Sequence, residues 1–519
     1  MMKNGKLLVA PALLWLSIFF VIPLLIVVAV SFAGRTPYGQ VIFSFTIDNY
    51  LRFLEPLYLK IFADTLVVAI VTTLATILMG YPLAYTIAQL PKKWQQPGLI
   101  LVMIPFWINF LIRSYAWVII LRSQGVVNTL LLNLGLIDQP LQMLYNDMAV
   151  MLGMVYALLP FMVLPIYVSI EQLDTRLLEA ASDLGAKPLT AFRKVTLPLT
   201  MPGIAAGTIL VFISSLGMFV VPDVMGGAKS ALIGNLIQNQ FLSARDWPFG
   251  SALSIVLAVL SLVLIILYYK ALQAQEGGDG DAKDGRSHLM VAYSLAILAF
   301  LYLPLLILAM YSFNESRINA VWTGFTFNWY EALFQNRRVL EALTNSLFIA
   351  VISTIASTTL GTIAAIALNR YQYKYKPVIN GLLYLPILIP EIVMGLSLLV
   401  LFAQAQVPLG KTTLILAHIT FCVSFVVITV NARLEGMRHE LEQAAMDLYA
   451  TPWKTFRYVT LPLALPGIVA GALIAFTLSI DDFIISFFVA GPNSTTLPLY
   501  IYARSNAVSP PRSTPCPHC

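Results

Sequence analysis

The pentapeptide Val195-Thr196-Leu197-Pro198-Leu199 recurs word for word as Val459-Thr460-Leu461-Pro462-Leu463, and a Pro-Gly pair follows both copies at the same distance. An earlier segment is repeated as well, because residues 45–50 (FTIDNY) return as residues 325–330 (FTFNWY). The order of these features is the same in both stretches. A repeated order of this kind predicts two homologous halves within one chain.

Both halves consist largely of apolar runs. Of the 519 residues, 59% are hydrophobic and 11% are charged, whereas about 25% charge is usual in soluble domains. Runs of roughly 18 or more apolar residues are typical of transmembrane helices. They predict an all-α integral membrane protein with eleven spans, near residues 7–33, 61–88, 98–121, 148–170, 202–222, 250–270, 288–313, 345–368, 378–402, 412–432 and 467–490.

A polar, Gly-rich stretch at residues 273–287 separates the halves and predicts a flexible cytoplasmic linker. Residues 1–272 then form a first half with six spans, and residues 288–509 form a second half with five. Six spans before the linker give both halves the same orientation, so we expect a pseudo-twofold axis along the membrane normal with a pathway between the halves. Residues 510–519 are rich in Pro and Cys and form an aberrant tail that cannot be a membrane helix.

The basic residues indicate the orientation. With the N-terminus in the cytoplasm, the cytoplasmic segments hold more than half of the 31 Lys and Arg residues, at roughly twice the density of the opposite side, as the positive-inside rule requires. These residues are scattered through short loops, which excludes a nucleic-acid-binding role for the net charge of +6.

The cytoplasmic loop between the fourth and fifth spans contains residues 177–188 (LLEAASDLGAKP). Its apolar residues recur at helical spacing, Gly185 suits a left-handed helix end, and Pro188 can open a second helix. The loop therefore predicts a short helix, a turn and another helix.

The same residues resemble the loop signature of the permease subunits of ABC importers, which is Glu-Ala-Ala, three residues, Gly, and later Ile/Val-x-Leu-Pro. The second half repeats the loop with the Glu displaced by one residue and Tyr449 in place of Gly, which in a left-handed turn costs on the order of 1 kcal/mol. The residues carried by this resemblance are Glu179, Ala180, Ala181, Asp183, Gly185 and Pro198 in the first loop, and Glu442, Ala444, Ala445, Asp447 and Pro462 in the second.

By this resemblance, each loop docks on a separate ATP-hydrolysing subunit, which we expect to be a homodimer. ATP would bind there, and the present chain would catalyse no reaction and hold no cofactor or metal ion. The alternative for either loop is an amphipathic helix lying on the membrane surface.

Other segments narrow the resemblance. Residues 105–113, 226–229 and 245–250 look like one permease subunit of spermidine/putrescine importers, and residues 311–314, 390–395 and 478–483 look like its partner subunit. The resemblance implies two subunits fused in one chain of the bacterial inner membrane, an extracytoplasmic polyamine-binding protein as partner, and a twelfth span that the tail does not supply. An ABC permease for iron or a phosphonate, and a docking scaffold inactivated by truncation, are the alternatives.

Ionisable side chains inside membrane spans cost several kcal/mol unless they face a cavity or a partner. A pathway lined by carboxylates and aromatic rings suits a flexible polycation. Glu391 or Asp482 could instead pair with Arg113 or cap a broken helix, or could carry protons in a secondary transporter. The predicted substrate-pathway residues are Trp107, Arg113, Asp223, Glu391, Asp481, Asp482 and Phe483.

Overall fold

The computed structural model describes residues 5–36, 39–227, 231–272, 288–316, 322–371, 375–435, 437 and 440–508. Within these residues, nine helices are long and apolar enough to cross a membrane, and two helix pairs pass the same test but are bent by 61° and 101° at a short break. Counting each bent pair as one span gives eleven, which is the predicted number. The predicted linker at 273–287 and tail at 510–519 lie outside the described residues.

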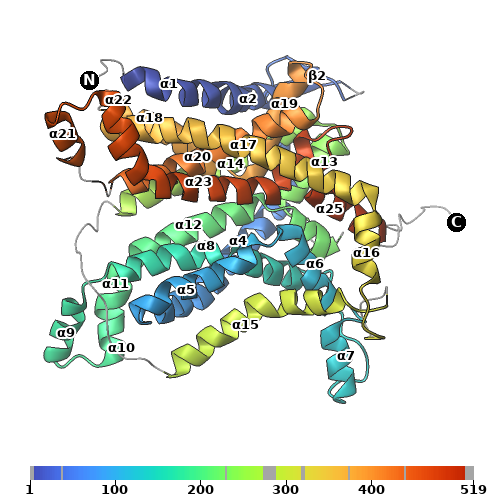
Figure 1. Cartoon of the computed structure of the whole chain (residues 1–519). Coiled ribbons are helices and arrows are strands. Elements are labelled where there is room, and N and C mark those ends of the chain that lie inside the picture. The colour runs from blue at the N-terminus through green and yellow to red at the C-terminus, as the bar shows by residue number, and fades with distance from the viewer. Residues whose placement is uncertain are drawn as a thin grey trace. The chain divides into compact units, whose positions relative to one another are not determined.

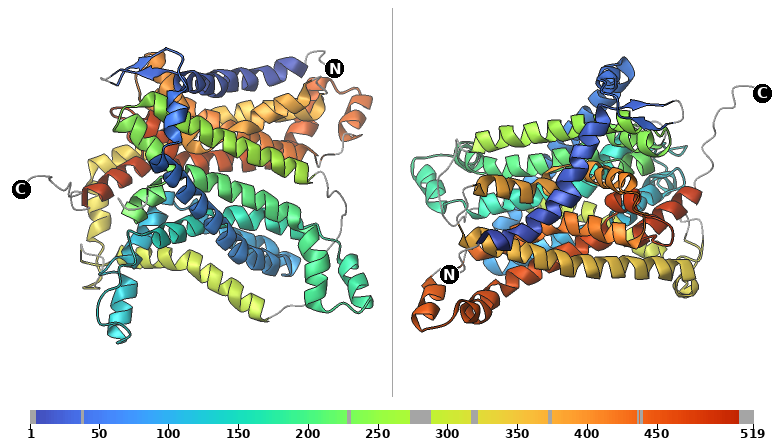
Figure 2. Two further views of the ribbon diagram at one scale, coloured as in Figure 1. Left: turned by 180° about the vertical axis from the view of Figure 1, so that it is seen from behind. Right: turned by 90° about the horizontal axis from the view of Figure 1, so that it is seen from above.

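The chain forms two compact units (Figures 1 and 2). Unit 1 comprises Met1–Ala29 and Phe334–Cys519, and unit 2 comprises Val30–Leu333. The units thus differ from the halves predicted along the chain: the N-terminal span belongs to the unit of the second half, and the first span after the linker belongs to the unit of the first half. The order of the spans along the chain does not reveal this exchange of first spans between the units. The sequence of an apolar helix does not indicate which group of helices it packs against.

The elements of unit 2 follow the chain from the first loop onward. They are β1 (Gly34–Arg35), β2 (Val41–Ile42), α3 (Asp48–Phe53), α4 (Pro56–Ala88), α5 (Lys92–Met103), η2 (Ile104–Trp107), α6 (Phe110–Leu121), α7 (Val126–Asn133), α8 (Asp147–Glu171), α9 (Thr175–Asp183), α10 (Pro188–Ala191), η3 (Phe192–Thr196), α11 (Leu197–Leu199), α12 (Met201–Gly217), η4 (Pro222–Gly226), α13 (Ile233–Leu242), α14 (Trp247–Leu272), α15 (His288–Tyr311) and most of α16 (Asn328–Gln335).

Unit 1 begins with the N-terminal helix, which contains one π-helical turn. Its elements are α1 (Gly5–Leu16), η1 (Ser17–Val21), most of α2 (Ile22–Ser31), α17 (Arg337–Arg370), α18 (Lys376–Leu388), α19 (Glu391–Gln404), α20 (Lys411–Glu435), α21 (Glu440–Asp447), α22 (Pro452–Thr455), η6 (Phe456–Thr460), α23 (Leu461–Asp481), α24 (Ile484–Val489) and α25 (Leu497–Val508).

Three helices form the core of each unit, namely α4, α8 and α12 in unit 2 and α17, α20 and α23 in unit 1 (Figure 1). Glycine permits the close approach of the first two helices. A Cβ added to Gly80 would lie 3.0 Å from the side chain of Met162, and one added to Gly361 would lie 2.7 Å from Val426. The same packing contact is therefore built twice, as expected for small residues at interfaces between membrane helices.

The repeated pentapeptide lies at the entry to the last core helix of each unit. Its Val-Thr pair ends a π-helical turn, η3 or η6, and its Leu-Pro-Leu begins the next helix. Proline is tolerated in a first helical turn because its missing N–H has no partner there. After this point the units differ, since unit 2 bends by 61° before α12 whereas α23 continues without such a bend.

An additional span packs on each core. In unit 1, Trp15 of α1 donates from Nε1 to Oγ1 of Thr420 at 3.1 Å. In unit 2, α15 is held by Tyr156, whose hydroxyl donates to the carbonyl of Leu301 at 2.8 Å. These side-chain hydrogen bonds join segments that are far apart in the chain. They fix the positions of the exchanged spans on the core helices of their units.

Four predicted continuous spans are broken, and for these the prediction was wrong in detail. Predicted span 202–222 is broken after Gly217, where Met218 has an extended backbone. Predicted span 98–121 is interrupted between η2 and α6, where Asn109 caps α6 by accepting from two backbone N–H groups. Predicted span 378–402 turns by 101° between α18 and α19, at Pro390, which cannot continue a helix. Predicted span 467–490 ends at Asp481 and restarts as α24.

Each copy of the repeated hexapeptide packs against the end of the helix that precedes it, and both copies lie in unit 2. The Ser31 hydroxyl lies 2.7 Å from that of Tyr50, and the Ser312 hydroxyl lies 2.8 Å from that of Tyr330. In each copy the first Phe of the hexapeptide stacks on a Phe at the end of the preceding helix, with ring centroids 5.4 and 5.2 Å apart. The sequence repeat therefore encodes a repeated structure after each half's first span.

Candidate functional site

The two loops predicted to face the cytoplasm fold as predicted, each with a helix, a turn and a second helix. In unit 2 these are α9 and α10, and in unit 1 they are α21 and α22 (Figure 1). Asp174 caps α9 by accepting from the backbone and side chain of Arg176, and these hydrogen bonds lower the pKa of Asp174 below its usual value. The confirmed feature is the fold of the loops, whereas docking stays a prediction.

The turns after α9 and α21 have the same backbone geometry. Gly185 has a φ of 77° and Tyr449 a φ of 61°. In the first turn the Ala186 N–H donates to Ala181 O at 2.9 Å, and in the second the Ala450 N–H donates to Ala445 O at 3.0 Å. Both helices therefore end in a Schellman-type turn, and the tyrosine occupies a conformation that favours glycine.

Apolar side chains are displayed at the tips of both loops. Leu184 is 89% exposed, and Leu448, which has the same place in the second loop, is 82% exposed. Leu189 and its counterpart Trp453 are also exposed, and Tyr449 is 96% exposed. Such side chains on a polar segment mark a surface suited to a protein or membrane partner.

The two glutamates of the loops have different environments. Glu179 is exposed. Glu442, displaced by one residue, turns toward its own unit, where its carboxylate pairs with Arg370 and accepts from the Thr460 hydroxyl at 2.6 Å. The two glutamates were predicted to be equivalent docking contacts, but their surroundings in the structure differ.

The structure brings together three predicted pathway residues in unit 1. Glu391 is the first residue of α19, directly after the 101° bend, and its side chain is exposed. It lies within electrostatic range of Asp482 and Asp481, at the break between α23 and α24. Gly395 allows this proximity, because its added Cβ would lie 3.0 Å from Phe488 of α24.

Asp482 has a structural role of its own. Its carboxylate accepts from the backbone N–H groups of Ile485 at 3.2 Å and Ser486 at 2.7 Å, and thus caps α24. His418 lies 3.3 Å from the same carboxylate and also contacts the hydroxyls of Ser479 at 2.7 Å and Ser486 at 2.9 Å. Capping of a broken helix was one of the alternatives left open by the sequence, and the geometry supports it for this residue.

Phe483 is 3% exposed and packs on Tyr502, with ring centroids 4.8 Å apart. Its contact with Tyr502 gives Phe483 a packing role within unit 1, and the predicted role in a substrate pathway stays a prediction. Asp481, in contrast, is only half-buried.

The predicted pathway residues of unit 2 have three different environments. Trp107 is 55% exposed in η2. Arg113 is buried, with its guanidinium 5.5 Å from the ring centroid of Phe106 and 5.8 Å from that of Phe110. The face of Phe106 is thus already occupied by a cation of the chain, and Asp223 is half-buried in η4.

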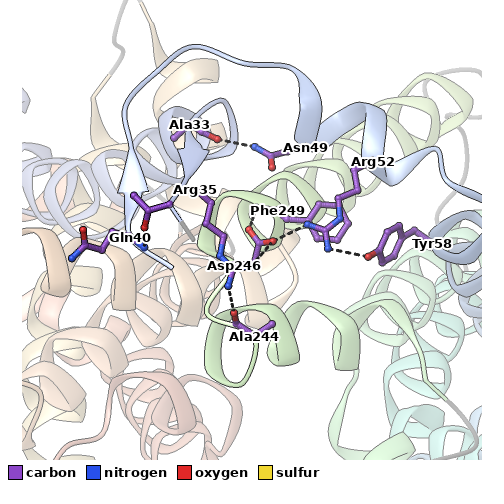
Figure 3. Close-up of polar contacts among 10 residues, drawn as sticks. Ala33, Arg35, Gln40, Asn49, Arg52, Tyr58, Ala244, Asp246 and Phe249 are labelled. Carbon is purple, nitrogen blue, oxygen red and sulfur yellow. Dashed lines mark hydrogen bonds and ion pairs between the residues drawn. The ribbon is translucent and has the colours of Figure 1, made fainter. Parts of the chain in front are cut away.

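A second charged cluster lies on the side predicted to be extracytoplasmic (Figure 3). Arg35 and Arg52 both reach one oxygen of Asp246, at 3.2 and 2.7 Å, and Arg52 also lies over the ring of Phe249 at 4.2 Å. Burial lowers the pKa of Arg52, but its hydrogen bonds to Asp246 and Tyr58 outweigh this effect and raise it. The cluster fastens the loop after the first span to the start of α14.

The family model of binding-protein-dependent transport system inner membrane components matches residues 77–276 and again residues 357–509. The chain belongs to this family. The two matches follow one another along the chain and cover most of both repeats, so this permease contains two family domains in tandem. It is a multi-pass membrane permease of an ABC importer.

Curated relatives match about half of the permease each. The spermidine/putrescine transport system permease protein PotB of Escherichia coli K12 is 48% identical over 257 residues, which are 50% of this chain and 94% of that protein. PotB of Haemophilus influenzae is 46% identical, over 52% of this chain and 94% of that protein. PotC of Escherichia coli K12 is 44% identical over 211 residues, which are 41% of this chain and 80% of that protein. These matches are consistent with a fusion of two permease subunits.

Among solved structures, a bacterial alginate ABC transporter in complex with an alginate-bound periplasmic protein is similar to the permease. One of its chains is 20% identical, with a TM-score of 0.45, over 53% of this chain and 98% of that chain.

Sequence reasoning missed several residues that the geometry brings to these sites. His418 lies in an apolar run, and a histidine there is itself a signal of a function or a partner within the membrane. The displacement of Glu442 by one residue was a signal for its contacts with Arg370 and Thr460. One residue along a helix rotates a side chain by about 100°, so Glu442 faces a different side of its helix from Glu179.

Proposed function

We propose that this permease forms the membrane pathway of an ATP-driven importer for spermidine or putrescine, with both permease halves in one chain. The observation that carries the proposal is the convergence of Glu391, Asp481 and Asp482 at the breaks of two helices in unit 1. The names of the relatives PotB and PotC support it.

The chemistry of the carboxylates favours a cationic solute. Isolated carboxylates within a membrane span cost several kcal/mol, and a solute with several ammonium groups relieves this cost by pairing with them. Asp482 is used for capping, so Glu391 and Asp481 are the residues that we propose to contact the solute. Both have exposed surface, which a fully buried carboxylate would lack.

Energy enters, in this proposal, through the two loops. Each presents an exposed leucine, Leu184 or Leu448, in the hydrogen-bonded turn directly after a short helix. Each loop would insert into a groove of a separate ATPase subunit, a homodimer that binds ATP, and closure of that dimer would shift the attached spans. In the orientation indicated by the basic residues, the loops and the N-terminus would lie in the cytoplasm of a bacterium.

An extracytoplasmic binding protein would deliver the solute from the opposite side. The family description, binding-protein-dependent transport, supports this partner. The loop fastened by Arg35, Arg52 and Asp246 supplies an ordered surface on the predicted side.

The test is solute uptake in vesicles that contain the permease, its candidate ATPase and a binding protein. We expect ATP-dependent uptake of labelled spermidine or putrescine, and no uptake of ferric ion or a phosphonate. Glu391→Gln should reduce polyamine uptake about tenfold or more, since an ion pair of the charged solute is lost. Glu341→Gln, which neutralises an exposed acid of α17, is the matched control and should leave uptake unchanged.

The outcomes separate the alternatives. Uptake of another solute would retain the importer and reject the polyamine. Uptake driven by a proton gradient without ATP would reject the ATPase, and a permease that captures the ATPase but transports none of the solutes would be a docking scaffold.

A further inference from the structure

The second cytoplasmic loop is fastened to its unit by a polar cluster of Arg370, Glu442 and Thr460. Arg370 donates to the Glu442 carboxylate and to the Thr460 hydroxyl, and that hydroxyl donates to the same carboxylate oxygen at 2.6 Å. The side chains of Arg370 and Glu442 are 25% and 16% exposed. Hydrogen bonds between charged groups are the stronger ones, and partial burial reduces their screening by salt.

The three residues come from three different elements. Arg370 ends α17, Thr460 ends η6 directly before α23, and Glu442 lies in α21. The third core helix is attached at the same end, because Arg433 of α20 donates from Nε to the Leu463 carbonyl at 3.1 Å. The loop helix is therefore connected through side chains to the ends of the core helices of unit 1.

In the part of the chain that the structure describes, the two positions that match this ion pair in the first half hold uncharged residues. In the register set by the repeated pentapeptide, Leu178 occupies the position of Glu442, and in the register set by Gly80 and Gly361, Gln89 occupies that of Arg370. The ion pair of the first loop joins Asp174 to Arg176, two residues apart in the same loop, at 2.9 Å. Neither partner belongs to a membrane span.

We infer that Arg370, Glu442 and Thr460 form a coupling clamp, which makes α21 a rigid extension of the core helices of unit 1. The inference rests on the proposed docking of the loops on an ATPase. A displacement of α21 by the ATPase then moves the ends of α17 and α23 directly through these side chains. The three residues are positioning residues, because the structure turns them toward the core instead of toward the partner.

The test compares Glu442→Gln with Glu440→Gln, a matched control that removes an exposed charge from the same helix. The readout is the number of solute molecules imported per ATP hydrolysed, measured beside capture of the ATPase by the purified permease. We expect Glu442→Gln to lower this ratio about tenfold, from the loss of charge-assisted hydrogen bonds, while ATPase capture stays within about twofold of the unmodified permease. Glu440→Gln should change neither quantity.

The reversed pair Arg370→Glu/Glu442→Arg protects the test against misfolding. It should recover a large part of the ratio that either single reversal loses, which loss of fold would not allow. A normal ratio for Glu442→Gln with intact ATPase capture would overturn the clamp and leave the proposed function standing. Failure of the unmodified permease to capture any ATPase would overturn both.

Discussion

The adjacent carboxylates Asp481 and Asp482 should respond in opposite ways to the same substitution. Asp482 is 4% exposed at its side chain, caps α24 through two backbone N–H groups and contacts His418. Asp481 ends α23, and as whole residues the two aspartates are both half-buried. We therefore expect Asp482→Asn mainly to destabilise unit 1 and Asp481→Asn mainly to impair solute uptake.

The contacts set the size of the effect. Replacing Asp482 by Ala removes the cap, worth about 1 kcal/mol, and a hydrogen bond to a charged group, worth about 1.5–3 kcal/mol. The loss for Asp482→Ala is then about 3 kcal/mol. Asp482→Asn keeps one acceptor oxygen for the cap but places an amide donor where the second oxygen was, so we expect about half of that loss.

The assay is thermal unfolding of the purified permease in lipid nanodiscs, paired with polyamine uptake per folded molecule. The expected order of midpoints is Asp482→Ala below Asp482→Asn, and Asp482→Asn below Asp481→Asn. Uptake should fall in Asp481→Asn only. Unchanged midpoints for both Asp482 variants together with lost uptake would refute the capping role and make Asp482 a solute contact.

Three further predictions concern the two predicted cytoplasmic loops and the loop after the first span. Tyr449→Gly should stabilise the end of α21 by about 1 kcal/mol, because glycine adopts the observed φ without strain, and hydrogen exchange of the Ala450 amide should slow about fivefold. Glu179→Arg should reduce ATPase capture or coupling while membrane insertion stays normal, as pull-down and coupled assays would show; normal coupling would count against docking of the first loop. Arg52→Ala should weaken the contact with buried Asp246 by about 1 kcal/mol and speed external proteolysis of the preceding loop about fivefold, an increase whose absence would show that the contact does not hold the loop.

Repeats and apolar runs were sufficient to predict the number of spans, the presence of two family domains and the helix-turn-helix of both loops. They did so because burial in lipid and helix termination depend on local composition. The break before Glu391 was visible as Pro390 but was not predicted, since proline is common within membrane helices whose neighbours satisfy the freed carbonyl.

Two other features depend on tertiary structure. The exchange of first spans between the units requires knowledge of which apolar faces fit, and apolar faces in lipid are chemically alike. The contacts of His418 join residues from α20, α23 and α24, so no single segment of the sequence contains them. The burial of Phe483 under Tyr502 has the same origin.

The two halves share several features of backbone conformation and packing, but they do not share the same charged residues. Both contain the Schellman-type turn, the π-helical entry to the last core helix and the glycine contact between the first two core helices. The positions that match Glu391, Asp481 and Glu442 in the first half hold Phe110, Gly217 and Leu178. In the proposed import cycle, movement of two similar halves would constrain the backbone in both, whereas one set of carboxylates would be enough to contact a single solute. Unit 1 therefore unites the acidic cluster with the clamped loop, and within that unit α23 connects the two, because it begins next to Thr460 and ends at Asp481.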